Sequence, residues 1–347
     1  MTTEILLFSG FIIFILGVLF IDLLLIGRNS HVVHPREALA WTAVWVTLAM
    51  GFYFLLLNFG HMLHGIDSPA RLAEVVKLYS PELIFRTEGF ENMLREYRQH
   101  MAINYLSGYF IEETLSIDNI FVILMVLQGF GVELKNYKTV LFWGILGAIV
   151  LRFIFIFAGA ALVHQFEWLL VVFGVFLIYQ SIHILVSSDH GIKDPQHHPV
   201  VKYLQRHIRL LPHYVDSKFW LRQEGKLFFT PLFVVLVMIE FTDLIFAFDS
   251  IPAIFAVSRD PFIVFFSNIF AIIGLRSLFF LLAGMVDKFR FLKPGVSALL
   301  AFVGFKLVLH SWLDQIGFKS WYSLVIIGSV LLLSVILSIL FPKKEKA

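Results

Sequence analysis

The sequence contains no cysteine and carries little charge. Without cysteine, disulfides, thiolate metal sites and cysteine nucleophiles are excluded. Asp, Glu, Lys and Arg make up only 15% of the 347 residues, whereas a soluble domain carries about 25%. Apolar residues make up 59% of the chain, Phe alone supplies 39 residues, and the mean hydropathy is +0.84. These proportions exclude an ordinary soluble fold and predict an integral membrane protein.

Apolar runs of membrane length follow one another along most of the chain. A helix needs about 20 residues to span a bilayer, and on that basis the sequence predicts an all-α polytopic membrane protein with about nine transmembrane helices. The first run is too long for a cleavable signal and too acidic, with Glu4 directly before it and Asp22 within it, so we expect a retained helix. The runs cover residues 5–27, 38–59, 101–130, 139–162, 167–187, 230–256, 262–284, 292–311 and 321–341.

Basic residues gather in alternate connections. With the N-terminus outside, the cytoplasmic connections hold 17 Lys and Arg residues and the outer connections hold 7. Because positive residues collect on the cytoplasmic side of a membrane, we expect the N-terminus outside and the C-terminus in the cytoplasm. Three basic residues lie within the runs themselves, namely Arg152, Arg276 and Lys306.

Two connections are long. The outer one, residues 61–100, contains SPARLAEVVKLY, in which Ser68 marks a helix start and Leu72, Val75 and Val76 share one face. We expect a second short helix between residues 81 and 100. The inner connection, residues 189–229, is basic and rich in histidine. We interpret it as a solvated linker facing lipid headgroups, with metal sensing as the alternative.

Two parts of the sequence resemble each other. FIEETLSIDNIFVILMVL at 110–127 aligns with FTDLIFAFDSIPAIFAV at 241–257, so that Asp118 matches Asp249 and Glu112 matches Asp243. Each copy contains three apolar runs, and an odd number makes the second copy enter the membrane from the opposite side. The sequence therefore predicts two inverted three-helix repeats. Further along, the copies pair Arg152 with Arg276 and His183 with Lys306.

The repeats divide the chain into six predicted parts. Two N-terminal helices precede the outer connection, and a C-terminal helix with a cytoplasmic tail follows the second repeat. The parts are residues 1–60, 61–100, 101–188 for the first repeat, 189–229, 230–311 for the second repeat, and 312–347.

Carboxylates interrupt both of the matching runs. Each one at the bilayer centre costs about 2.5 to 3.5 kcal/mol, so Glu240, Asp243 and Asp249 need compensation. Glu240 and Asp243 share a helix face, but Asp249 would point about 180° away from Glu240 on a straight helix. Because Pro252 disturbs the preceding turn, we expect a broken helix around residues 249–252 that frees backbone carbonyls to join the carboxylates.

Carboxylate and carbonyl oxygens without thiols suit hard divalent cations such as Ca²⁺, Mg²⁺ or Mn²⁺. Clustered carboxylates also take up protons when no metal is bound, which would couple metal release to proton entry. The alternative is that the acids pair with buried basic residues and only fix helix packing. The candidate metal ligands are Glu112, Asp118, Glu240, Asp243 and Asp249, and the candidate coupling or counter-charge residues are Arg152, Arg276, Lys306, Glu113 and Asn119.

Four motifs carry a resemblance to a known family. ETLSIDNIFV and EFTDLIFAFDSIPAIFAV, followed by GLRSLFFLLAG and FVGFKLVLH, resemble the paired signatures of the TerC family of integral membrane proteins, within the LysE transporter superfamily. The resemblance covers residues 1–60 and 100–341 and implies a Mn²⁺ exporter, with links to tellurite resistance and alkaline pH response in some members. It carries the family's acidic residues onto the five candidate ligands. The long 61–100 connection and the pairing of His183 with Lys306 depart from the family pattern.

These observations lead to one expected function and two alternatives. We expect a divalent cation exporter, with Mn²⁺ as transported substrate and no organic cofactor, working by alternating access and coupled to protons. Ca²⁺ is the alternative ion, since it accepts the same oxygen ligands. The alternative role is a membrane-protein biogenesis or metal-delivery factor that docks exported proteins through the outer connection. The resemblance implies a place in the bacterial inner membrane, so we expect membrane lipid as the surroundings and no nucleic-acid partner. We expect no enzymatic activity, because intramembrane protease motifs with Gly beside the aspartate are absent.

Overall fold

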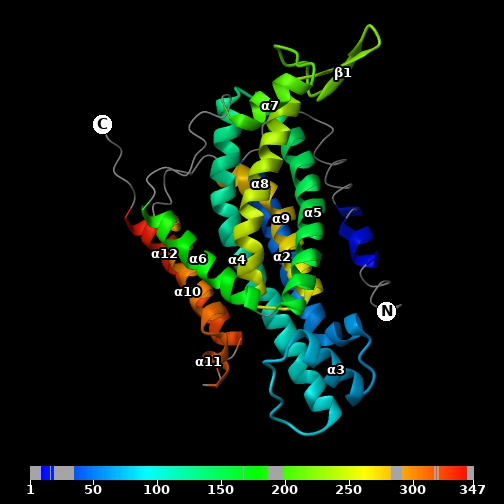
Figure 1. Ribbon diagram of the computed structural model, residues 1–347, viewed down its shortest axis with the longest axis vertical. Helices are drawn as coiled ribbons and strands as arrows, with labels where there is room; N and C mark the ends of the chain where they lie inside the picture. Colours follow the sequence, from blue (N-terminus) through cyan, green and yellow to red (C-terminus); the bar gives the residue numbers. More distant parts are fainter. Residues whose placement is uncertain are drawn as a thin grey trace.

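The computed structural model describes residues 9–15, 17–18, 35–166, 168–186, 198–282, 291–315, 318 and 320–341. Most of these residues are helical, and the helices form one elongated bundle (Figure 1). The helices are α2 (Pro35–Phe59), η1 (Gly60–His64), α3 (Pro69–Tyr79), α4 (Phe90–Gly129), α5 (Leu134–Gln165), α6 (Trp168–Val186), α7 (Pro199–His207), α8 (Pro231–Phe255), α9 (Pro261–Leu282), α10 (Leu292–Val308), α11 (His310–Gln315) and α12 (Ser320–Leu340).

Six helices within the described residues are long and apolar enough to cross a membrane: α2, α5, α6, α8, α9 and α12. Helix α4 is apolar in its second half but carries Glu112, Glu113 and Asp118 there, and it is not among the six. Helix α10 is apolar but shorter. The predicted first span, residues 5–27, lies mostly outside the described residues. An all-α polytopic membrane protein is therefore confirmed, and the number nine stays a prediction.

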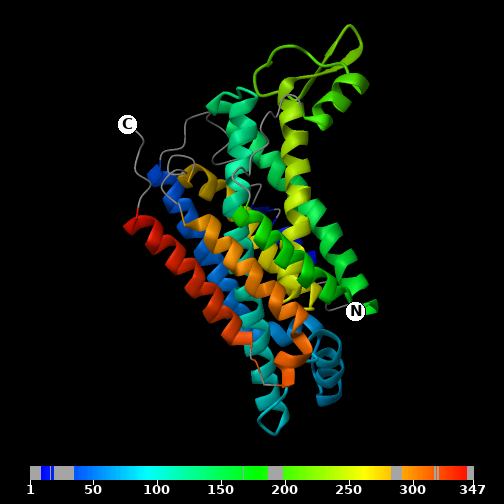
Figure 2. The same ribbon diagram turned by 60° about the vertical axis from the view of Figure 1, so that its left-hand side comes forward.

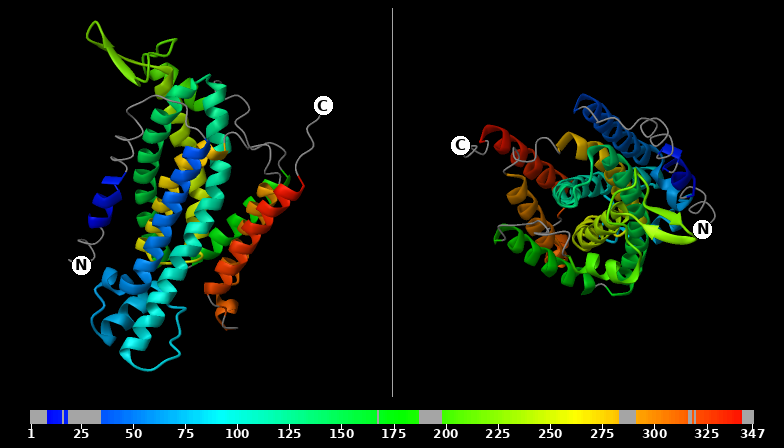
Figure 3. Two further views of the ribbon diagram at one scale, coloured as in Figure 1. Left: turned by 180° about the vertical axis from the view of Figure 1, so that it is seen from behind. Right: turned by 90° about the horizontal axis from the view of Figure 1, so that it is seen from above.

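Helices α4, α5, α8 and α9 form the centre of the bundle. Helix α4 packs on α9, α5 packs on α8, and α6 packs on α10, while α2 covers α4 and α9 and α12 covers α4 and α10. Figure 3 shows α10 and α12 on the side of the bundle opposite the helical residues 9–15. Helix α9 is buried on nearly all sides, which explains why its sequence shows no polar face.

Glycines lie at the contact between α6 and α10. A Cβ atom on Gly174 of α6 would lie 2.8 Å from the carbonyl oxygen of Gly304 on α10, and a Cβ on Gly304 would lie 2.8 Å from the carbonyl oxygen of Gly174. Glycine at both positions therefore lets the two backbones approach, as small residues do in other membrane helix pairs.

The outer connection is a packed helical cap. Helix α3 begins as predicted, with Ser68 Oγ accepting a hydrogen bond from the Arg71 backbone N–H at 3.4 Å, and its predicted face is buried. The second short helix is not a separate element. Helix α4 begins at Phe90 and runs without a break to Gly129, so the predicted boundary between residues 100 and 101 is wrong. Figure 2 shows this end of α4 extending beyond the bundle beside α3.

The inner connection is also more ordered than the predicted linker. Residues 187–197 lie outside the described residues, but α7 and a hairpin of β1 (Trp220–Gln223) and β2 (Lys226–Phe229) follow. The strands pair antiparallel, with Trp220 opposite Phe229. The hairpin stands at the opposite end of the bundle from α3 (Figure 1), so these two elements define a hairpin end and an α3 end.

The predicted break at residues 249–252 is absent from α8. The helix continues through Pro252 and ends at Phe255. A proline removes the bond to the carbonyl four residues earlier, but Pro252 lies in the last turn, so only one intrahelical bond is lost before the helix ends. The backbone carbonyls of residues 249–252 are therefore not freed to join the carboxylates, contrary to the prediction from the sequence.

Candidate functional site

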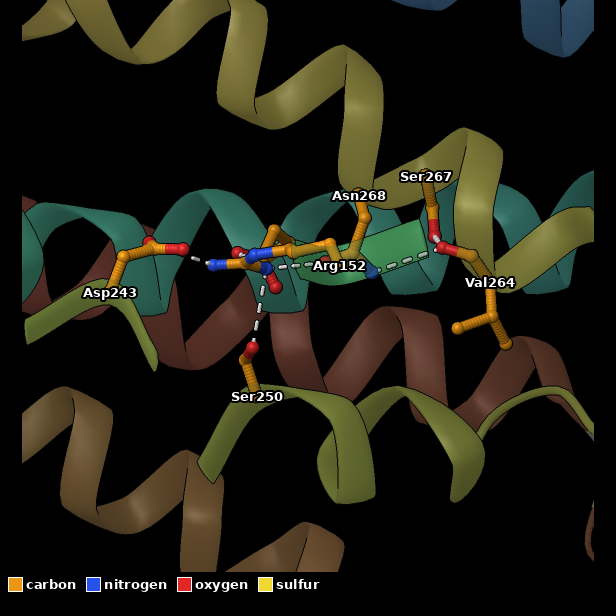
Figure 4. A network of polar contacts seen from close by, with 7 residues as sticks. Arg152, Asp243, Ser250, Val264, Ser267 and Asn268 are labelled. Carbon is orange, nitrogen blue, oxygen red and sulfur yellow. Dashed lines mark hydrogen bonds and ion pairs between the residues drawn. The ribbon is translucent and has the colours of Figure 1, made fainter. Parts of the chain in front are cut away.

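Arg152 lies at the centre of the bundle and joins four helices (Figure 4). From α5, its Nη1 donates to a carboxylate oxygen of Glu112 on α4, to Oδ1 of Asn268 on α9, and to Oγ of Ser250 on α8 at 3.3 Å. Its Nη2 lies 3.5 Å from Oδ1 of Asp243 on α8. The side chain of Arg152 is 1% exposed and that of Glu112 is 0% exposed, so this ion pair is shielded from water.

The amide of Asn268 is held in one orientation. Its Nδ2 donates to the carbonyl oxygen of Val264 at 3.0 Å, one helical turn earlier, and Ser267 Oγ donates to the same carbonyl at 2.9 Å (Figure 4). This leaves Asn268 Oδ1 directed at Arg152. The prediction from sequence missed Asn268. The available signal was the polar pair Ser267–Asn268 inside an otherwise apolar run.

Three carboxylates of the site each keep one buried oxygen with no hydrogen-bond partner among the described residues: Glu112 Oε2, Asp243 Oδ2 and Glu240 Oε2. Glu240 packs against Gly147 of α5, where a Cβ atom would overlap its carboxylate. An unpaired buried polar atom costs about 1 to 3 kcal/mol and calls for a water, a proton or an ion. These oxygens therefore mark a place where something further can bind.

A small cavity adjoins Asp243. It has a volume of about 20 Å³ and is lined by Asp243, by Arg276 of α9, and by apolar residues including Ile123, Leu141 and Phe279. That space is enough for about one water molecule. The lining residues of α4, α5 and α9 lie toward the hairpin end of these helices, so Asp243 faces that end of the bundle.

The structure brings together some of the predicted site residues. Glu112 and Asp243 share Arg152, with Glu240 one turn before Asp243. Asn119 is buried on α4 and Glu113 is half-buried. The side chains of Asp118 and Asp249 lie outside the described residues. Across the described ranges, no three His, Asp or Glu side chains are grouped so that they could hold a metal ion.

Lys306 lies apart from the other candidate counter-charges. It lines a cavity of about 40 Å³ at the α3 end, together with Glu82, Arg259 and His310. Glu82 Oε1 lies 3.1 Å from Nε2 of His100. Burial alone would raise the pKa of Glu82, but the hydrogen bond and the charge of His100, with the charge of Arg259, outweigh burial and hold that pKa below its ordinary value.

Comparison with known proteins places the chain in a family. Residues 97–346 match the family described as integral membrane protein TerC family. The chain belongs to the TerC family. The sequence resemblance is thereby confirmed for the greater part of the chain.

Relatives within the TerC family cover nearly the whole chain. Alx of Salmonella typhi is 42% identical over 88% of this chain and 85% of its own length, and Alx of Escherichia coli strain K12 is 40% identical over 88% and 86%. Their names propose a role as membrane-bound redox modulators. An uncharacterized membrane protein of Myxococcus xanthus is 38% identical over 96% of this chain and 92% of its own length. No solved structure matches the chain.

Proposed function

We propose that this protein exports divalent cations, with Mn²⁺ as the principal substrate, by alternating access around Glu112, Glu240 and Asp243. The observation that carries the proposal is the set of unpartnered carboxylate oxygens on two facing helices at the centre of the bundle. Intramembrane carboxylates are costly and usually mark ion pathways. An all-oxygen donor set suits hard cations. Ca²⁺ remains the alternative ion because it accepts the same ligands.

The packing pattern supports the alternating-access part of the proposal. In the predicted repeats, α4, α5 and α6 correspond to α8, α9 and α10. The contact of α4 with α9 then corresponds to the contact of α8 with α5, and the contact of α6 with α10 corresponds to itself. This exchange of partners is what an inverted repeat requires, and transporters of this type place their ion site at the repeat interface.

The proposed orientation of the bundle in the membrane is consistent with transport out of the cell. The basic residues from the start of α7 to the end of the hairpin, residues 199–229, favour the hairpin end as the cytoplasmic side. Asp243 then faces a cavity on the cytoplasmic side, where an exporter collects its substrate. The residues concerned are Lys202, Arg206, Arg209, Lys218, Arg222 and Lys226.

The test is cellular manganese in Mn²⁺-loaded cells that express the wild type or Asp243→Asn at matched levels, with calcium measured in parallel. The control is Asp67→Asn, the same chemical change at an exposed aspartate of the outer connection. We expect the wild type and Asp67→Asn to lower manganese and Asp243→Asn to leave it high. Equal efflux by all three proteins, or by none, would contradict an exporter that uses this site.

The same experiment addresses the docking alternative. A biogenesis or metal-delivery factor that works through the outer connection would tolerate Asp243→Asn and depend on the α3 region. The redox role in the names of the Alx relatives has no thiol basis in this chain, because the sequence contains no cysteine and thiol–disulfide exchange requires one.

A further inference from the structure

We infer that Arg152 is a tethered counter-cation that competes with the transported ion for Glu112 and Asp243, and that Asn268 and Ser250 hold its guanidinium when the ion binds. The inference rests on the proposed function and explains how the bound cation leaves the site. Arg152 would then be part of the transport cycle and not only a buried structural ion pair.

The geometry places the guanidinium where a cation would bind. Nη1 contacts Glu112 and Nη2 contacts Asp243, so one side chain occupies both carboxylates at once. A divalent ion that binds between α4 and α8 would use the same two carboxylates through their unpartnered oxygens, Glu112 Oε2 and Asp243 Oδ2. Two positive groups cannot share them at low cost, since like charges a few ångströms apart repel strongly in a poorly solvated site. Binding of the ion therefore requires Arg152 to release at least one carboxylate.

Two neutral acceptors already contact the same nitrogen of Arg152. Oδ1 of Asn268 and Oγ of Ser250 both accept from Nη1. Because Val264 fixes the Asn268 amide, this acceptor stays in place when the carboxylates turn to an ion. A buried donor that loses every partner pays a large desolvation penalty. Asn268 and Ser250 spare the guanidinium that penalty, which makes its release from the carboxylates feasible.

The return movement would help to expel the ion. Once the site opens to the outer side, Arg152 can pair again with Glu112 and Asp243, so the empty site is not left with two uncompensated buried carboxylates. An exporter benefits from this arrangement because it needs weak binding at the side of release. Removal of the positive charge should therefore tighten ion binding and slow turnover. Loss of a merely structural ion pair would instead weaken ion binding and slow turnover.

The test uses the full chain purified in lipid nanodiscs, titrated with Mn²⁺ alone by calorimetry, together with the concentration dependence of Mn²⁺ efflux in cells. For Arg152→Gln we expect Mn²⁺ to bind about tenfold more tightly, which corresponds to a modest coupling free energy. We also expect a lower KM and a lower maximal rate of Mn²⁺ efflux. Asn268→Leu keeps every charge and removes the neutral acceptor, so we expect binding weakened by a similar factor. Thermal unfolding of each variant reports whether it is folded.

The outcomes separate the inference from the proposed function. If the wild type binds and exports neither Mn²⁺ nor Ca²⁺, the proposed function fails and this inference fails with it. If the wild type binds Mn²⁺ and folded Arg152→Gln binds it equally or more weakly, only the inference is overturned. Should Arg152→Gln not fold, Asn268→Leu decides alone, because affinity unchanged from the wild type contradicts the role assigned to Asn268.

Discussion

Asp243 and Asp260 are two aspartates of the predicted second repeat that each contact a basic side chain from another element, and they use their oxygens differently. Asp260, at the start of α9, gives Oδ2 to Nε2 of His64 at 2.8 Å and accepts the backbone N–H of Phe262 at 2.9 Å through Oδ1. Asp243 has Oδ1 at 3.5 Å from Arg152 Nη2, and its Oδ2 is unpartnered among the described residues. A carboxylate with both oxygens engaged stabilises the fold, while one with a free oxygen beside a cavity can bind a ligand.

The largest expected effect is on Mn²⁺ binding by Asp243→Asn. This variant should lose calorimetrically measured binding and shift the thermal midpoint by less than about 2 °C, a small effect for a helical protein of this size. Stability is retained because Arg152 keeps its contacts with Glu112, Ser250 and Asn268. A midpoint that falls as far as in Asp260→Asn would show that the two aspartates have the same structural role.

Gly147→Ala is expected to reduce efflux several-fold. The new methyl group would overlap the carboxylate of Glu240 and push that side chain out of its place. Gly51→Ala on α2 is the matched control, because a Cβ atom there has nothing within 4 Å. Efflux assays in cells with matched expression provide the measurement. Equal activity of the two alanine variants would show that the position of Glu240 is irrelevant to transport.

Asp260→Asn should act on stability more than on transport. The substitution removes the charge that faces His64, and a hydrogen bond to a charged group contributes about 1.5 to 3 kcal/mol. We therefore expect the thermal midpoint to fall by several degrees, while efflux per folded molecule stays near the wild-type value. Loss of efflux without a fall in the thermal midpoint would show that the Asp260 contact acts in transport and not in stability.

The contrast between the two aspartates also shows which features of the site could be predicted from the sequence. Composition, membrane-length runs and the matching motifs predicted the helical fold and brought Glu112, Asp243 and Arg152 to attention, because intramembrane charge is rare and costly. The partners depended on three-dimensional packing. Helix α9 meets α4 and α5 only in the folded bundle, so nothing in the sequence around Asn268 indicated that it would contact Arg152.

The errors at α4 and α8 have different physical causes. Outside the bilayer core, α4 continues as a polar helix from Phe90, and hydropathy detects only its apolar part. In α8, proline was expected to break the helix, but its cost is small in a last turn where few bonds remain to be lost. Hydropathy thus locates the apolar part of a helix better than its ends, and a proline breaks a helix less when it lies in the last turn.

The smallest expected effect concerns the α3 end, where Glu82 extends the comparison to a third carboxylate. Its pKa is lowered from 4.5, since the hydrogen bond and charge of His100 outweigh burial. The native state therefore holds fewer protons at Glu82 than the unfolded state does between the two pKa values. This contribution to stability is present above pH 4.5 and is lost as the pH falls through the lower, folded-state pKa.

Glu82→Gln should consequently lower the thermal midpoint of the purified protein above pH 4.5 and converge with the wild type in more acidic buffer. Glu88→Gln, at an exposed position of the same connection, should follow the wild type at every pH. Efflux at neutral pH should be retained by both variants, because Glu82 lies in the cavity at the α3 end, away from Arg152. If Glu82→Gln abolished efflux while its midpoint stayed unchanged, the cavity shared with Lys306 would belong to the transport path and the division between the two regions would fail.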